Sequence, residues 1–301
     1  MSKTKSVALV LSSGGARGVA HIGVIEALLA EGYEISSISG CSMGAVVGAV
    51  YAAGELDAYK NWLCNLDKLD VFKLIDFTLS TQGFIRGEKV FREMKKFLHD
   101  RKIEELNIPF SANATDIVNG EEVVFSTGSL YKAIRASSSI PSVLKPSIVD
   151  HRELVDGGVL NPLPIDNVSR STNDLLVVSD VNSPIKYDNQ TTTNKAQKAS
   201  ASHYKILLDQ FVQKWGDYLP KKDLTPIRHE KSAKSKFGYL DLMNQSINLM
   251  QDKLAAQTIA QHQPDIIVNV SRDICGAFNF YRAEELIEAG KQAFHKAHKK
   301  S

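Results

Sequence analysis

A serine flanked by glycines is the first group in this chain that could do chemistry. The stretch Gly40-Cys41-Ser42-Met43-Gly44 follows a short apolar segment and precedes a run of small residues. A serine hydroxyl attacks a carbonyl carbon only when a base takes its proton and hydrogen-bond donors hold the developing oxyanion. Small flanking residues allow the sharp strand-to-helix turn that exposes such a hydroxyl. The alternative is a small residue in an ordinary turn, and the pattern by itself leaves both interpretations open.

A second glycine-rich stretch, residues 12–18, offers candidate donors for an oxyanion. One interpretation is a dinucleotide-binding loop, but Ser13 stands where that motif has its first glycine, and the next strand lacks the expected acid at its end. The other interpretation is an oxyanion hole. Neighbouring parallel strands bring the loops at their carboxyl ends together, so the amides of Gly14 and Gly15 could face the carbonyl that Ser42 attacks.

The base is harder to find. The eight histidines stand in poor contexts, and His262 is the least unfavourable of them. A serine as early as position 42 also leaves too little chain before it for the strands of an α/β-hydrolase. The stretch LVDGGVLNPLP offers Asp156 instead, delivered by a short strand into a turn at Gly157 and Gly158. Asp-Gly-Gly is also ordinary turn chemistry, so the motif alone does not decide.

The elements that would position these groups alternate along the chain. Short β-branched runs predict strands, and longer runs with helical periodicity predict helices. The strands are expected at 7–11, 35–39, 110–117, 121–126, 153–155, 175–181 and 265–270, and the helices at 19–31, 45–53, 129–138 and 282–300. The opening order strand–helix–strand–helix predicts an α/β fold with a parallel sheet covered by helices.

Bulk composition narrows the class of protein. The 301 residues are 43% hydrophobic and 23% charged, as in an ordinary globular protein. The net charge of +2 does not indicate a nucleic-acid partner. Three cysteines far apart argue against both a disulfide framework and a metal site. No signal peptide or membrane-spanning run is evident, so we expect a cytoplasmic protein with at most peripheral membrane contact.

One segment, residues 186–236, differs in charge from the rest. It carries eleven Lys and Arg against five Asp and Glu, which makes it +6 while the rest of the chain sums to −4. Residues 203–219 within it place apolar and aromatic side chains on one helical face. Such a helix can lie in an anionic membrane interface or form a lid, or it can be an ordinary helix packed on the core.

Taken together, LVLSSGGARGVAHIGVIEAL, GCSMGAVVGAVYAAG, AIRASSSIPSVLKP and LVDGGVLNPLP closely resemble the patatin-like phospholipase family, with the best match over residues 7–167. The resemblance implies a three-layer α/β/α fold with a mainly parallel central sheet, as a single domain over 1–301. It implies Ser42 as nucleophile and Asp156 as general base. The family's glycine loop would provide the oxyanion hole through Gly14 and Gly15, with Arg17 at its basic position, either adding charge or anchoring the loop. The remaining motif glycines are Gly18, Gly40, Gly44, Gly157 and Gly158.

The expected activity is therefore hydrolysis of a lipid acyl ester, like that of a phospholipase A or lysophospholipase, through an acyl-enzyme and without a metal or organic cofactor. Two features depart from the family pattern. Ser13 replaces the first glycine of the loop, which matters only if that position needs positive φ, and residues 186–236 lie outside the matching region. The alternatives are a catalytically silent lipid-binding or membrane-binding protein and, less favoured, a nucleotide-binding enzyme that uses the loop at 12–18.

Overall fold

A computed structural model of the chain describes residues 5–74, 87–99, 101–141, 143–187 and 239–299. The chain divides into two compact units, residues 1–187 with 246–301 and residues 188–245. The described elements belong to the first unit, apart from the first turns of the helix Tyr239–His262. The basic segment predicted over 186–236 lies outside the described residues from position 188 onward. Its role, and the organisation of 1–301 as one domain, stay predictions.

A central sheet organises the first unit, as the alternating pattern of the sequence predicts. Its strand order is β5-β6-β3-β2-β1-β7-β8, and β4 pairs with β3 off this path. The four pairings from β3 through β2, β1 and β7 to β8 are parallel, and those of β3, β4, β5 and β6 with one another are antiparallel. The strands are β1 (Lys5–Leu11), β2 (Tyr33–Cys41), β3 (Phe110–Asp116), β4 (Glu121–Phe125), β5 (Ser147–Val149), β6 (Arg152–Asp156), β7 (Leu175–Ser183) and β8 (Ile266–Ser271).

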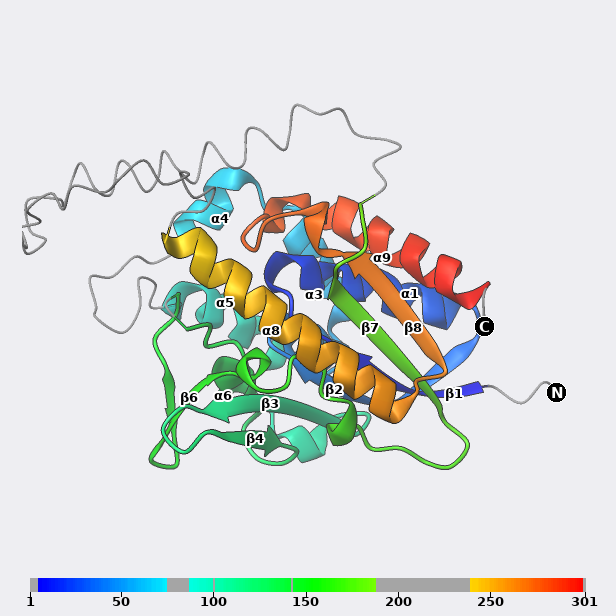
Figure 1. Cartoon of the computed structure of the whole chain (residues 1–301), viewed down its shortest axis with the longest axis horizontal. Helices are drawn as coiled ribbons and strands as arrows, with labels where there is room; N and C mark the ends of the chain where they lie inside the picture. Colours follow the sequence, from blue (N-terminus) through cyan, green and yellow to red (C-terminus); the bar gives the residue numbers. More distant parts are fainter. Residues whose placement is uncertain (1–4, 75–86, 100, 142, 188–238, 300–301) are drawn as a thin grey trace, which may run out of the picture. The chain divides into compact units, whose positions relative to one another are not determined.

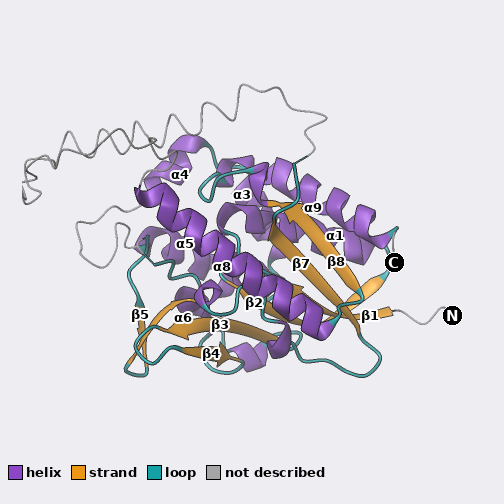
Figure 2. Ribbon diagram, in the orientation of Figure 1, coloured by secondary structure: helices purple, strands orange, loops and turns teal. Residues whose placement is uncertain are grey.

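Helices cover both faces of this sheet (Figures 1 and 2). They are α1 (Ala20–Ala30), α2 (Met43–Ala52), α3 (Leu56–Cys64), α4 (Lys68–Leu74), α5 (Glu88–Leu98), α6 (Leu130–Ser137), α8 (Tyr239–His262) and α9 (Ala283–His298). The mainly parallel sheet between helical layers confirms the predicted α/β/α fold. None of the described helices combines the length and the apolar character that a bilayer crossing requires.

Alternation along β1 shows how the two faces are filled. Leu9 and Leu11 point into the larger core with α1, α2 and α9, whereas Val10 packs on the opposite face with Val178 of β7 and, at its margin, Ile259 of α8. Successive side chains of a strand point to opposite faces, and a strand buried on both faces reads as a continuous apolar run. The run at 7–11 is therefore the sequence signature of a central strand.

Glycines let two pairs of elements approach closely. A Cβ on Gly44 of α2 would lie 2.3 Å from the Leu11 carbonyl oxygen, so this helix begins against the end of β1. A Cβ on Gly23 of α1 would lie 1.8 Å from the Ile287 oxygen, and one on Gly290 of α9 would lie 2.0 Å from the Ala20 oxygen. The backbones of α1 and α9 thus touch, and one face of α9 is buried.

Candidate active site

Ser42 occupies a sharp turn between β2 and α2. Its φ of 53° and ψ of −119° are a conformation that an L residue keeps only where its surroundings hold it. The Val46 amide donates to the Ser42 carbonyl at 3.0 Å, so helical bonding starts at the serine itself. A Cβ on Gly40 would lie 2.6 Å from the Ala45 nitrogen. The flanking glycine is therefore required by the turn, and the geometry is that of a nucleophile elbow.

The carboxylate of Asp156 meets the hydroxyl of Ser42 directly. Ser42 Oγ donates to Asp156 Oδ2 at 2.5 Å, and both side chains are buried. The two residues are 114 positions apart in the chain. Strand β3 brings them together, because Cys41 at the end of β2 pairs with Asn113 and Asp156 at the end of β6 pairs with the next residue, Ala114. A hydroxyl held against a buried carboxylate is the arrangement that direct proton removal by the carboxylate requires.

Burial changes the acidity of this carboxyl group. Removal from water raises the pKa of Asp156 to about 6, against the opposing effect of hydrogen bonds from Ser42, the Gly158 amide and the Cys41 thiol. The Gly158 amide donates to Oδ1 at 2.8 Å, and Cys41 Sγ lies 3.8 Å from the same oxygen. Oδ1 is thus held by the protein while Oδ2 faces the serine. A carboxylate with a raised pKa is a stronger base than one in water.

The end of α6 supports both members of the pair. Ser137 Oγ accepts a hydrogen bond from the Ser42 amide at 2.9 Å. The Asp156 amide donates to the Ser139 carbonyl at 2.9 Å, and the Ser139 hydroxyl is in turn bonded to Arg135. One short stretch of chain therefore fixes the relative position of serine and aspartate.

The glycine-rich loop lies beside the serine, at the carboxyl end of the neighbouring strand. Among the described residues, neither the Gly14 nor the Gly15 amide donates a hydrogen bond, whereas the amides of Ser13 and Ala16 on either side donate to backbone carbonyls at 2.9 and 2.8 Å. A Cβ on Gly18 would lie 2.3 Å from Met43 Cγ, next to the serine. Two adjacent free amides in a loop packed against the elbow can bind an anion.

Arg17 and Ser13 take part in the bonding that holds this loop in place. The Arg17 side chain donates from Nε and Nη2 to Asn182 Oδ1 at 3.0 and 2.7 Å, and its backbone amide donates to Gly14. Asn182 Nδ2 donates to the Ser13 carbonyl at 2.7 Å. These contacts favour the anchoring role for Arg17. Ser13 does not have positive φ, so its substitution for glycine imposes no backbone strain.

A fully buried histidine lies under the same loop. His21 Nε2 lies 3.0 Å from the Ser12 carbonyl oxygen and Nδ1 lies 2.8 Å from Ser179 Oγ. Because a carbonyl oxygen only accepts, Nε2 carries the proton and Nδ1 accepts from the Ser179 hydroxyl. Burial lowers the pKa of His21 to about 4, so it is neutral at physiological pH. It is a structural support of the loop and does not bond to Ser42 or Asp156.

No histidine of the described chain hydrogen-bonds to Ser42 or Asp156. His262, the least unfavourable candidate from the sequence, ends α8, where its Nε2 lies 2.8 Å from a carboxylate oxygen of Asp166. His203 and His229 lie outside the described residues. The pair therefore has no imidazole relay within the part of the chain that the structure describes.

A second carboxylate organises the segment that follows Asp156. One oxygen of Glu122, on β4, accepts the side-chain amides of Asn113, Asn161 and Asn167 at 2.9, 3.0 and 2.9 Å. Asn113 also fills the space beside Gly157, where a Cβ would lie 2.5 Å from its carbonyl oxygen. Glu122 thereby ties β3 and β4 to the turn that carries the aspartate.

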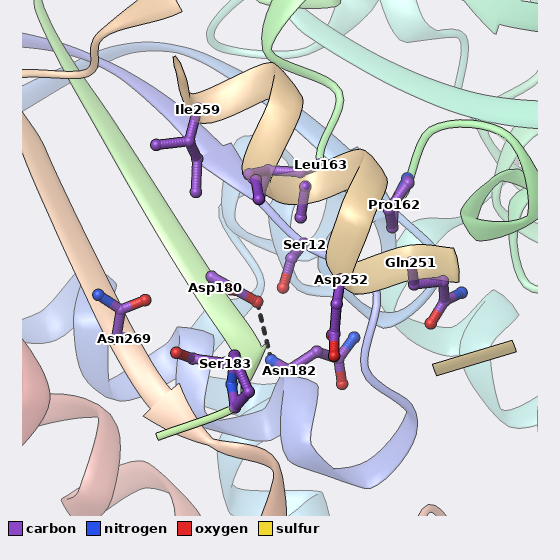
Figure 3. A pocket seen from close by; sticks show the side chains of 13 residues that line it. Ser12, Pro162, Leu163, Asp180, Asn182, Ser183, Gln251, Asp252, Ile259 and Asn269 are labelled. Carbon is purple, nitrogen blue, oxygen red and sulfur yellow. Dashed lines mark hydrogen bonds between the residues drawn. The ribbon is translucent and has the colours of Figure 1, made fainter. Parts of the chain in front are cut away.

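Helix α8 covers this turn and a neighbouring cavity. Gln251 Nε2 donates to the Gly158 carbonyl at 2.8 Å. Beneath the helix lies a cavity of about 160 Å³ whose lining includes Ser12, Asp180 and Gln251 (Figure 3). Ser42 and Asp156 do not line it. Asp180 is buried there with its Oδ1 accepting the Asn182 amide at 2.9 Å, and burial raises its pKa. The described residues contain no group of acidic, histidine or cysteine side chains suited to a metal.

The sequence interpretation missed four of these supporting residues: Ser137, Ser139, Gln251 and Glu122. The two serines lie within the stretch AIRASSSIPSVLKP, whose run of small polar residues after a helix was a usable signal. Gln251 and Glu122 gave none, because their roles arise from contacts between segments distant in the chain.

The chain is similar to known proteins in family, in sequence and in structure. The model of the family described as "Patatin-like phospholipase" matches residues 9–168. An uncharacterized NTE family protein of Mycobacterium tuberculosis is 35% identical to the chain and matches 96% of it and 90% of its own length. Lysophospholipase NTE1 of Cryptococcus neoformans is 32% identical over 60% of this chain, which corresponds to 11% of that protein. Among solved structures, VipD from Legionella pneumophila has a TM-score of 0.49 at 12% identity, covering 99% of this chain and 67% of that one.

Proposed function

Because this chain belongs to the patatin-like phospholipase family, we propose that it hydrolyses a carboxylic ester bond of a lipid, with Ser42 as nucleophile and Asp156 as base. The observation that carries the proposal is the buried 2.5 Å hydrogen bond from Ser42 Oγ to Asp156 Oδ2. The similarity to a protein named lysophospholipase favours a phospholipid or lysophospholipid as substrate.

The first half of the reaction forms an acyl-enzyme. Ser42 Oγ attacks the ester carbonyl carbon while its proton passes to Asp156 Oδ2, and the carbonyl oxygen becomes an oxyanion. The tetrahedral intermediate collapses as the alcohol leaves with the proton that Asp156 holds. Because the carboxylate is buried, it binds this proton more strongly than a carboxylate in water would. The hydrogen bond already present places donor and acceptor before substrate arrives.

The second half releases the fatty acid. A water molecule attacks the acyl carbonyl carbon and gives a proton to Asp156, and Asp156 returns that proton to Ser42 Oγ as the second tetrahedral intermediate collapses and the bond between Ser42 and the acyl group breaks. Atoms balance with water as the only co-substrate. The same carboxylate thus serves as base and then as acid in each half of the reaction.

The glycine loop would stabilise both intermediates. The free amides of Gly14 and Gly15 are donors that need no reorganisation when the oxyanion forms. Arg17 acts through its bond to Asn182, which holds the loop, and not as a donor to the oxyanion. Gly18 packs against Met43 of the elbow, which favours an oxyanion-hole role for the loop over a dinucleotide-binding role.

The test is active-site labelling of the purified protein with a soluble fluorophosphonate, followed by mapping of the modified residue. We expect modification at Ser42 alone and no labelling of Ser42→Ala. For Asp156→Asn we expect a loss of roughly 10² to 10⁴ in hydrolysis rate, the usual contribution of a general base, with the folded structure retained. Ester hydrolysis by Ser42→Ala at the wild-type rate would contradict the assignment, and a folded wild-type protein that is neither labelled nor active would favour a catalytically silent lipid-binding protein.

A further inference from the structure

Helix α8 carries apolar side chains on two opposite faces. On one face Ala255 and Ile259 pack against the sheet, and Gln251 bonds to the turn after Asp156. On the other face Leu249 and Met250 are each 58% exposed. At 100° per residue these two positions point away from the packed face. The face that carries Leu249 and Met250 therefore takes no part in the packing of the described core.

The helix that carries this exposed face contacts the candidate active site through its packed face. Met250 precedes Gln251, whose side chain contacts Gly158 at 2.8 Å. On the other side of that contact, Val159 and Leu160 follow Gly158 and are exposed as well. Large apolar side chains therefore stand exposed on both chain segments that meet beside the base. Exposed apolar side chains on two segments that contact each other are typical of an interaction site.

The charges on this stretch of α8 indicate what kind of surface fits. Between residues 246 and 262 the only acidic side chain is Asp252, which is paired with Arg272. Lys253 is exposed one turn after Leu249, so its basic group stands beside the apolar pair. Apolar side chains with a lysine beside them can bind a lipid surface. The aliphatic part of the lysine lies along apolar groups there, and its amine reaches anionic head groups.

We propose that Leu249 and Met250 of α8, together with Val159 and Leu160, form the surface through which this protein contacts aggregated lipid, a bilayer or a micelle. The inference rests on the proposed function for the choice of lipid as the partner. It adds that the apolar contact is made by the two segments that meet at Gly158, two residues after Asp156. Lys253 gives the contact its preference for anionic head groups.

The test measures sedimentation of the full chain with vesicles of phosphatidylcholine, with and without phosphatidylglycerol. The double variant Leu249→Asp/Met250→Asp should bind to vesicles roughly tenfold more weakly or worse, because charged groups oppose burial in the interface. The control is Val118→Asp/Ile148→Asp, which adds the same charge at positions 72% and 69% exposed elsewhere and should bind as wild type does. Lys253→Ala should weaken binding only to vesicles that contain phosphatidylglycerol.

Fluorophosphonate labelling of Ser42 reports whether each variant keeps its active site. If Leu249→Asp/Met250→Asp is not labelled, Leu249→Gln/Met250→Gln is used in its place. Wild-type binding by the α8 variant, or an equal loss in the control, would overturn the proposal. The proposal would also be overturned if the α8 variant bound vesicles as wild type does but changed from a dimer to a monomer. That result would mean that this face is a contact between two copies of the chain. Sedimentation with vesicles needs no catalysis. Absence of labelling in the wild type would therefore refute the proposed function, whereas the sedimentation result would still show whether this face binds lipid.

Discussion

In the proposed mechanism Asp156 needs no histidine, because its surroundings both raise its basicity and orient its carboxylate. Burial makes its carboxylate more basic, and the Gly158 amide and Cys41 thiol keep Oδ1 occupied so that Oδ2 faces Ser42. An imidazole relay would serve the same purpose by placing a base of suitable pKa next to the hydroxyl. In the proposed reaction the position of the carboxylate in the fold would replace this relay.

The raised pKa of Asp156 predicts a simple pH dependence. The base must be ionised to take the Ser42 proton, so kcat/KM for a neutral soluble ester should rise with pH through about 6 and level off above it. Initial rates across this range, corrected for hydrolysis in the presence of Ser42→Ala, measure the effect. An acidic limb near pH 4 would contradict the burial argument, since that is the range of a carboxyl group in water.

Single residues differed in how far the sequence could predict them. Ser42 and Asp156 stand in short motifs whose glycines are needed by the local backbone, so the neighbouring residues in the sequence indicate the turn in which each one lies. Glu122 stands in no such motif. Its three asparagine partners come from positions 113, 161 and 167, and only the pairing of β3 with β4 and the path after β6 bring them to one oxygen.

The same contrast holds for whole elements. The opening strand–helix–strand–helix unit was predicted because each element pairs or packs with its neighbour in sequence. Helix α8 was not predicted, because apolar residues on both of its faces blur the helical periodicity that reveals an amphipathic helix. The face of Ala255 and Ile259 meets the sheet, and the face of Leu249 and Met250 is exposed.

Close packing of α2 on β1 predicts that Gly44 tolerates no side chain. In Gly44→Ala the new Cβ would lie 2.3 Å from the Leu11 oxygen and 2.5 Å from the Ser12 oxygen, so the helix must move away from the strand and the elbow must shift. We expect a loss of about 3 kcal/mol or more in the free energy of unfolding, typical of severe overpacking. Urea unfolding of the wild type and the variant measures it.

Gly32→Ala is the matched control. Gly32 has a φ of 78° and no atom within 4 Å of an added Cβ, so alanine there should cost only the left-handed backbone strain, about 1–2 kcal/mol. Equal losses in the two variants would mean that the α2–β1 contact is looser than described. Gly44→Ala should also lose fluorophosphonate labelling of Ser42, which Gly32→Ala should keep.

At the scale of the whole molecule, two buried groups make stability depend on pH in opposite directions. His21 has its pKa lowered to about 4, so the unfolded chain binds more protons between about pH 4 and 6.5, and stability rises with pH there. Asp156 has its pKa raised to about 6, so the folded state binds more protons between about pH 4 and 6, and stability falls as pH rises. Between about pH 4 and 6 the contributions of His21 and Asp156 to the free energy of unfolding largely offset each other. The pH dependence of wild-type stability therefore shows neither contribution by itself.

Replacing Asp156 by asparagine should reveal its contribution, because His21 is common to both proteins and cancels. From a pKa of about 6 against an ordinary value of 3.8, the stability of Asp156→Asn relative to wild type should increase by about 2 kcal/mol between about pH 4.5 and pH 8. The variant would thus be inactive and, at alkaline pH, comparatively stable, the pattern expected where a site holds a charge at the expense of stability. Urea unfolding at several pH values measures the difference.

Asp57→Asn controls for the loss of one negative charge, since Asp57 is exposed on α3. Because the Asp57 side chain is exposed to water, this variant should not reproduce the gain in stability at alkaline pH that is expected of Asp156→Asn. A difference for Asp156→Asn that is constant or shrinks with rising pH would mean that the folded state does not disfavour the ionised carboxylate. In that case the basicity assigned to Asp156 would lose its physical cause, and the direct proton transfer from Ser42 would need another source of driving force.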